Sequence, residues 1–230
     1  KGCPVQSRTS REIKIAYIGG GSRSWAHVLM CDLALCPKIS GHLVLYDIDT
    51  PAARSNALVG QDIFSRPDAK TRFRVSAVDT PAAALKGADF VVCSIEPGPT
   101  RMRYADLEIP AKYGILQTVG DTVGPGGLMR SLRSVPIMTH YAHLIMKHCP
   151  RAWVINYTNP MTLCVSALYH AEPTIKAFGC CHEVFGTQWY LADLVGKTFG
   201  VPRPDRHEIH LDISGVNHFT FATAASWQGQ

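Results

Sequence analysis

A glycine-rich loop, Gly19-Gly20-Gly21-Ser22, follows an apolar run and precedes a segment of helical period. Glycine lets the backbone turn tightly and approach a diphosphate, and a helix N-terminus offers unpaired N–H groups to its negative charge. Asp47 ends the next apolar run, where a carboxylate accepts hydrogen bonds from ribose hydroxyls and repels a 2′-phosphate. The order of strand, glycines, helix and acid predicts an NAD site rather than an NADP site. Ser24 replaces the third glycine of the usual pattern, and a glycine turn without a ligand is the alternative.

A second group of reactive side chains is Cys180-Cys181-His182-Glu183, again at the end of an apolar run. A thiolate, an imidazole and a carboxylate can hold a soft or borderline divalent ion, or supply a proton. His218 follows the last apolar run and would complete a metal site with Cys181. The alternatives are a buried free thiol with capping His and Glu side chains, and a structural role for His218.

A third candidate is Asn159, which stands directly before Pro160 and just after an apolar run. Its amide can both donate to and accept from a sugar hydroxyl. The residue before a proline is usually extended, so we expect the Asn159 side chain to face a ligand. A helix start with Pro160 in the first position is the alternative.

The elements that position these residues alternate between strands and helices, which predicts an α/β fold: a Rossmann-type doubly wound parallel sheet. We expect strands at 14–18, 43–47, 73–78, 90–95, 153–156, 175–180 and 208–214, and helices at 24–35, 52–64, 80–85, 128–148, 161–170 and 185–199. Residues 96–127, rich in Gly and Pro, are predicted to be a long irregular segment. We expect a flexible tail at 1–12, the NAD-binding domain at 13–180, and at 181–230 the start of a second, substrate- and metal-binding domain.

Composition excludes several classes of protein. The 230 residues carry a net charge of +5, but Lys and Arg are scattered, so we expect no nucleic-acid partner. No run of 18 apolar residues predicts a membrane span, and residues 1–10 lack a signal peptide, which favours the cytoplasm. Eight cysteines are present, and we expect most of them to be buried as small hydrophobes, among them Cys31, Cys36, Cys93 and Cys164.

Taken together, the motifs resemble glycoside hydrolase family 4, whose members use NAD and a divalent metal to cleave glycosidic bonds. The resemblance covers essentially the whole chain. It rests on the Gly19 loop, Asp47, Ile109-Pro110-Ala111-Lys112-Tyr113-Gly114, Asn159-Pro160, Cys181-His182-Glu183-Val184 and Gly215-Val216-Asn217-His218.

The resemblance implies a role for each site residue. Cys181 and His218 would bind Mn²⁺, Asn159 would contact the substrate, and His182 would be the catalytic acid. The Cys-His-Glu-Val sequence is similar to that of the α-galacturonidase branch. For an α-galacturonide we expect Arg101, with Arg103 and Lys112, to reach the carboxylate, and Asp121 to bind sugar hydroxyls.

The implied reaction differs from hydrolysis by two carboxylates. NAD would take a hydride from C3 of the sugar, the C2 proton would then be lost, the leaving group would be eliminated, water would add, and NADH would return the hydride. Family members are much longer and place the general base after the counterpart of His218, so we expect a chain truncated relative to the family. A homo-oligomer, dimer or tetramer, is also expected. The rival hypotheses are a malate- or lactate-type NAD-dependent dehydrogenase and a truncated NAD-binding module without activity.

Overall fold

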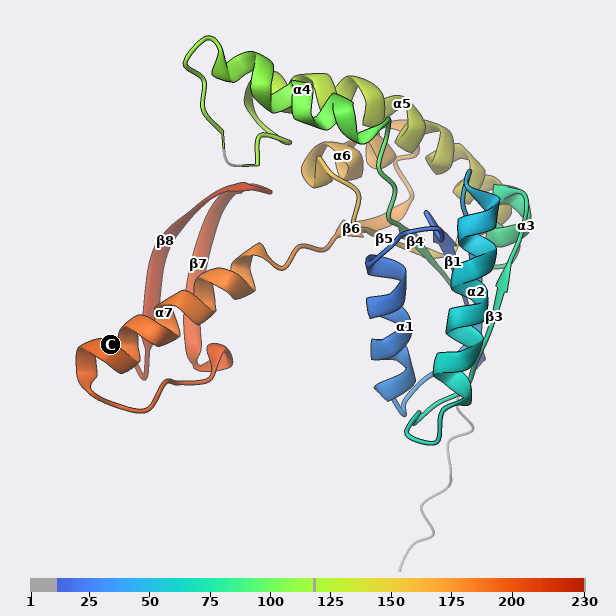
Figure 1. Ribbon diagram of the computed structural model, residues 1–230, viewed down its shortest axis with the longest axis horizontal. Helices are drawn as coiled ribbons and strands as arrows, with labels where there is room; N and C mark the ends of the chain where they lie inside the picture. The colour runs from blue at the N-terminus through green and yellow to red at the C-terminus, as the bar shows by residue number, and fades with distance from the viewer. Residues whose placement is uncertain (1–11, 118, 230) are drawn as a thin grey trace, which may run out of the picture. The chain divides into compact units, whose positions relative to one another are not determined.

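The computed structural model describes residues 12–117 and 119–229, and Figure 1 shows the course of the chain. The expected tail at 1–12 therefore lies outside the described residues, except for Glu12, which begins the first strand. In chain order the elements are β1 (Glu12–Ile18), α1 (Trp25–Leu35), β2 (Ser40–Tyr46), α2 (Thr50–Ser65), β3 (Phe73–Ala77), α3 (Pro81–Leu85), β4 (Phe90–Cys93), α4 (Thr100–Ala111), α5 (Gly124–His148), β5 (Trp153–Asn156), α6 (Met161–Ala171), β6 (Lys176–Gly179), α7 (Glu183–Phe199), a 3₁₀ turn (Arg206–Glu208), β7 (Ile209–Val216) and β8 (Phe219–Trp227).

The chain folds into two compact units, each assembled from separate stretches of sequence. Among the described residues, the first unit comprises 12–96, 137–158 and 167–178, and the second comprises 97–117, 119–136, 159–166 and 179–229. The second unit thus takes in segments that precede residue 181. The expected functional boundary between residues 180 and 181 stays a prediction, because compactness alone does not say which residues bind which ligand.

The first unit is built on a six-stranded sheet in the order β3-β2-β1-β4-β5-β6. The four neighbouring pairs from β3 to β5 are parallel. This is the strand order of a dinucleotide-binding fold, in which ligands lie beyond the carboxyl ends of the strands where the order reverses. The predicted Rossmann-type fold is confirmed.

The core of this unit follows from strands that are apolar on both faces, as in a parallel sheet covered by helices. Helices α1 and α2 lie side by side (Figure 1). Their close approach depends on Gly60, because a Cβ at that position would lie 2.6 Å from Met30 Sδ. The fully buried side chains of the strands include Tyr17, Ile18, Leu43, Leu45, Val91, Val92 and Val154.

The second unit corrects two predictions. Residues 96–127 were expected to be irregular, but α4 occupies Thr100–Ala111. The Gly and Pro residues of this stretch lie mainly on either side of α4, and only Pro110 falls inside it, near its end. The strand expected last is instead half of an antiparallel pair, β7 with β8, which forms a separate two-stranded sheet. The alternation of β8 was missed because its side chains are mostly exposed, so its polar and apolar residues do not mark a buried face.

The cysteine prediction holds only in part. Cys93 and Cys164 are buried, Cys36 is half-buried and Cys31 is exposed. Cys31 follows the buried Met30 on α1, and one residue turns a helix by about 100°, which carries its side chain off the buried stripe. None of the described helices is long and apolar enough to cross a membrane.

Candidate functional site

The glycine loop of the first unit is held by the strand beside it. Gly19 N and Gly20 N both donate to Tyr46 O at 2.9 Å, and Gly21 N donates to Asp47 Oδ2 at 2.9 Å. The other oxygen of Asp47 accepts from Asp49 N at 2.9 Å. Asp47 therefore fixes the loop, and the lone pairs that remain on its carboxylate are available to a ribose hydroxyl.

The glycines are required by close approaches within the unit. A Cβ on Gly19, whose φ is +95°, would lie 1.9 Å from Ser94 O. A Cβ on Gly21 would lie 2.9 Å from Asp47 Oδ2 and 3.0 Å from Ala52 Cβ. A larger residue at position 21 would thus displace the carboxylate of Asp47 directly.

The donors that such a loop offers to an anion lie after its glycines. The N–H groups of residues 19–21 are used as described, and Ser22 N donates to Gly19 O at 3.0 Å. Within the part of the chain that the structure describes, Arg23 N and Ser24 N meet no acceptor. They precede α1 directly, so they fit the phosphate-binding position at a helix N-terminus.

Asn56 is a residue of this site that sequence reasoning missed. Its Nδ2 donates to Gly20 O and to Ser22 O, each at 2.8 Å, and its Oδ1 lies 2.9 Å from His27 Nε2. The signal was present, because Asn56 is a polar residue on the buried stripe of α2 that includes Ala53, Ala57, Gly60 and Phe64. A buried amide needs partners, and the carbonyls of the loop supply them.

In the second unit the fold brings together the two predicted metal ligands. Cys181 Sγ lies 3.5 Å from His218 Nε2. For a tetrahedral zinc ion, bonds of about 2.3 Å to sulfur and about 2.0 Å to nitrogen place those two atoms about 3.5 Å apart. Cys181 lies between β6 and α7, and His218 lies in the turn between β7 and β8. The spacing of the pair therefore suits two ligands of one ion.

His218 is held at its ring and at its backbone. Its Nδ1 lies 2.8 Å from Asp121 Oδ1, and its backbone N donates to Glu183 Oε2 at 3.2 Å. Its φ is +59°, a left-handed backbone conformation that residues other than glycine rarely adopt. Such a conformation persists only where the surroundings over-determine it, and these contacts do so here.

Buried charge surrounds this histidine. The side chains of Asp121 and Arg130 are 2% and 4% exposed, with 3.9 Å between Asp121 Oδ2 and Arg130 Nη1. Arg130 Nε also donates to Asn159 O at 3.2 Å, and Ser134 Oγ donates to the same carbonyl at 3.4 Å. The arrangement fixes the backbone of Asn159 from α5 and compensates the charge of Asp121.

The polar atoms left over at this site are acceptors. Asp121 Oδ2 and Asn217 Oδ1 are buried and have no hydrogen-bond partner among the described residues. Unpartnered oxygens, a sulfur and an imidazole nitrogen suit a cation, a water molecule or a sugar hydroxyl. The described part of the chain contains no group of three or more His, Cys, Asp or Glu placed to hold an ion.

Two further thiols of the unit differ from Cys181. Burial raises the pKa of Cys164 to about 12, and the nearby charges of Arg130 and Asp121 act on it in opposite directions. Burial, and then the neighbouring Cys181, raises the pKa of the Cys180 thiol. Both groups are therefore poor thiolate ligands at neutral pH.

Three other predicted site residues belong to the same unit. His182 is exposed and precedes the first residue of α7. Arg101 is exposed in the first turn of α4. Asp121, expected to bind sugar hydroxyls, holds His218 through Oδ1. The substrate roles of these residues and of Asn159 stay predictions.

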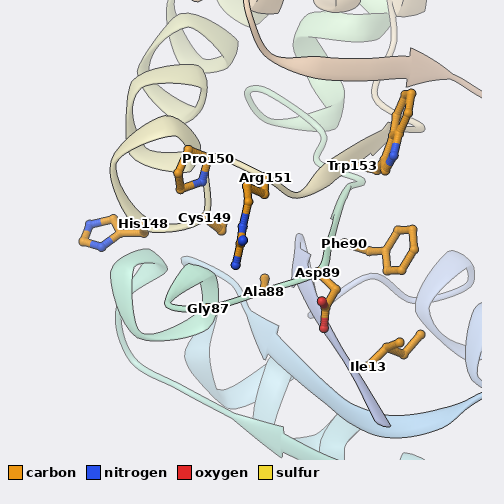
Figure 2. Close-up of a pocket in the computed structure, with 10 residues that line it drawn as sticks. All are labelled: Ile13, Gly87, Ala88, Asp89, Phe90, His148, Cys149, Pro150, Arg151 and Trp153. Carbon is orange, nitrogen blue, oxygen red and sulfur yellow. The ribbon is translucent and has the colours of Figure 1, made fainter. Parts of the chain in front are cut away.

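A pocket of about 620 Å³ lies elsewhere in the first unit (Figure 2). It is lined by Ile13, Phe90 and Trp153 at the amino ends of β1, β4 and β5, with Arg151 pointing toward Ala88. The glycine loop follows the carboxyl end of β1, so this pocket lies at the opposite edge of the sheet from the predicted nucleotide site.

Comparison with known proteins decides the family. The sequence model of the family 4 glycosyl hydrolases matches residues 14–197. The chain belongs to this family. The resemblance that the motifs indicated is confirmed, and membership favours a glycosidase over a malate- or lactate-type dehydrogenase.

The relatives of this family 4 chain include an alpha-galacturonidase from Lachnoclostridium phytofermentans, 51% identical over 218 residues, which are 95% of this chain and 47% of the relative. A crystal structure of a putative glucosidase from Bacillus subtilis superimposes with a TM-score of 0.87 at 48% identity, covering 94% of this chain and 49% of that one. A 6-phospho-beta glucosidase from Thermotoga maritima, solved with manganese, NAD⁺ and glucose-6-phosphate, has a TM-score of 0.75 at 25% identity, covering 95% and 50%. The chain thus spans about half the length of the relatives it matches.

Proposed function

We propose that this chain is the NAD- and metal-binding part of a glycoside hydrolase that cleaves α-galacturonides. The observation that carries the proposal is the 3.5 Å separation of Cys181 Sγ and His218 Nε2 in a unit where Asp121 also holds the histidine. The family match and the 51% identity to an alpha-galacturonidase support the same function. We keep residues 13–180 as the NAD-binding domain and 181–230 as the start of the substrate- and metal-binding region.

The proposed cofactors are NAD and a divalent ion, most simply Mn²⁺, the ion present with NAD⁺ in the Thermotoga maritima relative. Gly19, Gly20, Gly21 and Ser22 would shape the nucleotide site, and Asp47 would accept a hydrogen bond from the adenosine ribose. Cys181 and His218 would hold the ion. When bound, the two cofactors supply a hydride acceptor for the sugar and a Lewis acid for its hydroxyl oxygens.

The remaining groups act on the substrate and on protons. Asn159, its backbone fixed by Arg130 and Ser134, would present its amide to a sugar hydroxyl. His182, exposed beside the metal ligand Cys181, would give a proton to the departing oxygen. Asp121 Oδ2, which has no hydrogen-bond partner in the part of the chain that the structure describes, would accept from a sugar hydroxyl or from water.

Recognition of the uronide carboxylate is proposed for Arg101. Its guanidinium can bind a carboxylate through two parallel hydrogen bonds. Arg103 lies two positions along α4, so it points about 200° away around the helix. Lys112 lies on the side of Arg101 but about three turns, ~16 Å, further along. The three residues therefore cannot share one carboxylate, and Arg103 becomes a control for Arg101.

The experiment is a panel of p-nitrophenyl α-galacturonide, α-galactoside and α-glucoside, assayed on the protein as its organism makes it. NAD, Mn²⁺ and a thiol reductant are each omitted in turn. We expect cleavage of the galacturonide above all, and loss of activity with each omission. Arg101→Ala should raise KM for the galacturonide at least ~10-fold, as the loss of a charge-assisted contact implies, and Arg103→Ala should change it less.

Other outcomes of the panel are informative. Equal or better cleavage of the galactoside or glucoside would overturn the uronide assignment and leave the cofactors standing. NAD binding without any cleavage would favour a module without activity.

We also propose that the enzyme is cytoplasmic, because reducing conditions there keep Cys181 a thiol. We propose in addition that it is a homo-oligomer, and light scattering tests its oligomeric state directly.

A further inference from the structure

The contact between Asp121 and His218 has a definite direction of donation. A carboxylate only accepts hydrogen bonds, so Asp121 Oδ1 at 2.8 Å requires that His218 Nδ1 carry a proton. The neutral imidazole then has its lone pair on Nε2. That nitrogen is the atom 3.5 Å from Cys181 Sγ.

We propose that Asp121 is a positioning residue that holds His218 in the Nδ1–H tautomer and fixes its ring plane, so that Nε2 stays available to a metal ion. The inference rests on the proposed metal site and assigns a role to a residue outside the ligand pair. A carboxylate that accepts from the second nitrogen of a ligating histidine both orients the ring and raises its basicity.

The burial of Asp121 makes this contact effective. Its side chain is 2% exposed and that of His218 is 17% exposed, so water competes little for either group. A buried carboxylate is costly unless it is compensated, and Arg130, 4% exposed, lies 3.9 Å from the second oxygen. The bond from His218 N to Glu183 Oε2 holds the backbone at the same time.

A comparison within the unit separates this role from that of an ordinary ion pair. Asp106 and Arg133 form a two-pronged pair, with Arg133 Nη1 donating to Asp106 Oδ1 at 3.2 Å and Arg133 Nη2 donating to Oδ2. The closest approach of the Asp121 carboxylate to the Arg130 guanidinium is 3.9 Å, which is too long for a hydrogen bond. Asp121 Oδ1 instead lies 2.8 Å from His218 Nδ1, and it also accepts from Thr122 Oγ1 at 3.4 Å.

The test compares Asp121→Asn with Asp106→Asn, which removes a carboxylate of the same unit that does not touch His218. An asparagine amide can donate as well as accept, so Asp121→Asn permits both tautomers of His218. Long-range ¹⁵N–¹H spectra of the metal-free protein identify the tautomer, and titration with Mn²⁺ or Co²⁺ gives the affinity. Circular dichroism establishes the temperature at which each variant is folded, and spectra are recorded there.

We expect the Nδ1–H tautomer in the wild type and in Asp106→Asn, and a mixture in Asp121→Asn. The metal dissociation constant should rise about 10- to 100-fold in Asp121→Asn, as for other losses of such partners, and little in Asp106→Asn. An unchanged tautomer in Asp121→Asn, or an equal loss of affinity in both variants, would overturn the proposal. If the wild type bound neither ion, the proposed metal site would fail, while the spectra would still decide what Asp121 does to His218.

Discussion

Cys181 Sγ and His218 Nε2 lie 3.5 Å apart although 37 positions separate the two residues in sequence. The turn between β6 and α7 supplies the first, and the turn between β7 and β8 supplies the second. Neither turn alone would suggest more than a structural thiol or histidine. Their convergence beside a buried carboxylate is the geometry on which the account of this chain depends.

Replacement of Cys181 tests that geometry, and its neighbour provides the control. Cys181→Ser should raise the metal dissociation constant at least ~100-fold, because a thiolate ligand is lost and a serine hydroxyl is a poor substitute. Cys180→Ser should have little effect, since burial already raises the pKa of the Cys180 thiol. Calorimetric titration with Co²⁺ measures both dissociation constants. Equal effects of the two substitutions would show that Cys181 is not a ligand.

The left-handed backbone of His218 makes two substitutions at this position differ. Glycine adopts a φ of +59° without penalty, whereas alanine does not. His218→Gly should therefore be more stable than His218→Ala by about 1 kcal/mol, and both should lose the metal. Denaturant unfolding measures the stability of each variant, and metal titration measures whether each variant still binds the ion. If the alanine variant were the more stable of the two, the backbone at position 218 would not be held in the left-handed conformation by the fold.

Gly21→Ala should weaken NAD binding at the other candidate site. The added Cβ would lie 2.9 Å from Asp47 Oδ2, so the carboxylate must move away from the loop. We expect a rise of at least ~10-fold in the dissociation constant for NAD and a loss of roughly 1–3 kcal/mol in stability from overpacking. Gly186→Ala is the control, because a Cβ at that position would meet no described atom within 4 Å outside its sequence neighbours and the backbone of its own helix. Calorimetry showing equal NAD affinity in the two variants would contradict this account of the loop.

The stability of the first unit should fall in mild acid through His42. Burial, and then Arg74 and Lys14, lowers its pKa below the ordinary 6.5. Its Nε2 lies 2.8 Å from Ser76 Oγ. The neutral form is favoured in the folded state, so its contribution is present above pH ~6.5 and is lost as the pH falls toward the lowered pKa. Thermal melting between pH 7 and pH 5 should therefore depend on pH less steeply in His42→Gln. A steeper dependence in that variant would be inconsistent with the sign of the shift.

Local signals made the first unit predictable. The apolar β1, the glycine loop and Asp47 follow one another within a single strand-helix-strand unit, and such short-range order fixes the Rossmann topology. The sequence therefore predicted an NAD site together with its loop and its acid. Asn56 was overlooked because a single polar residue within an apolar helical stripe reads as an interruption, whereas here it binds two loop carbonyls.

The second unit was less predictable because its contacts join distant positions. Asp121 and His218 are 97 residues apart, and no spacing in the sequence connects them. The helix α4 was concealed by Gly and Pro residues that mostly flank it, and β8 by the exposure of its side chains. The metal pair was predicted through the family resemblance, while the contact of Asp121 with His218 became visible only in the fold.

The most direct test of the central claim is to cleave p-nitrophenyl α-galacturonide in D₂O with NAD and Mn²⁺ present, using the protein as its organism makes it. Proton spectra of the released galacturonate report deuterium at C2. Elimination after oxidation at C3 removes the C2 proton and returns one from solvent, so the account predicts a product labelled at C2. Cleavage that proceeds at the same rate without NAD and leaves the C2 proton in place would contradict it.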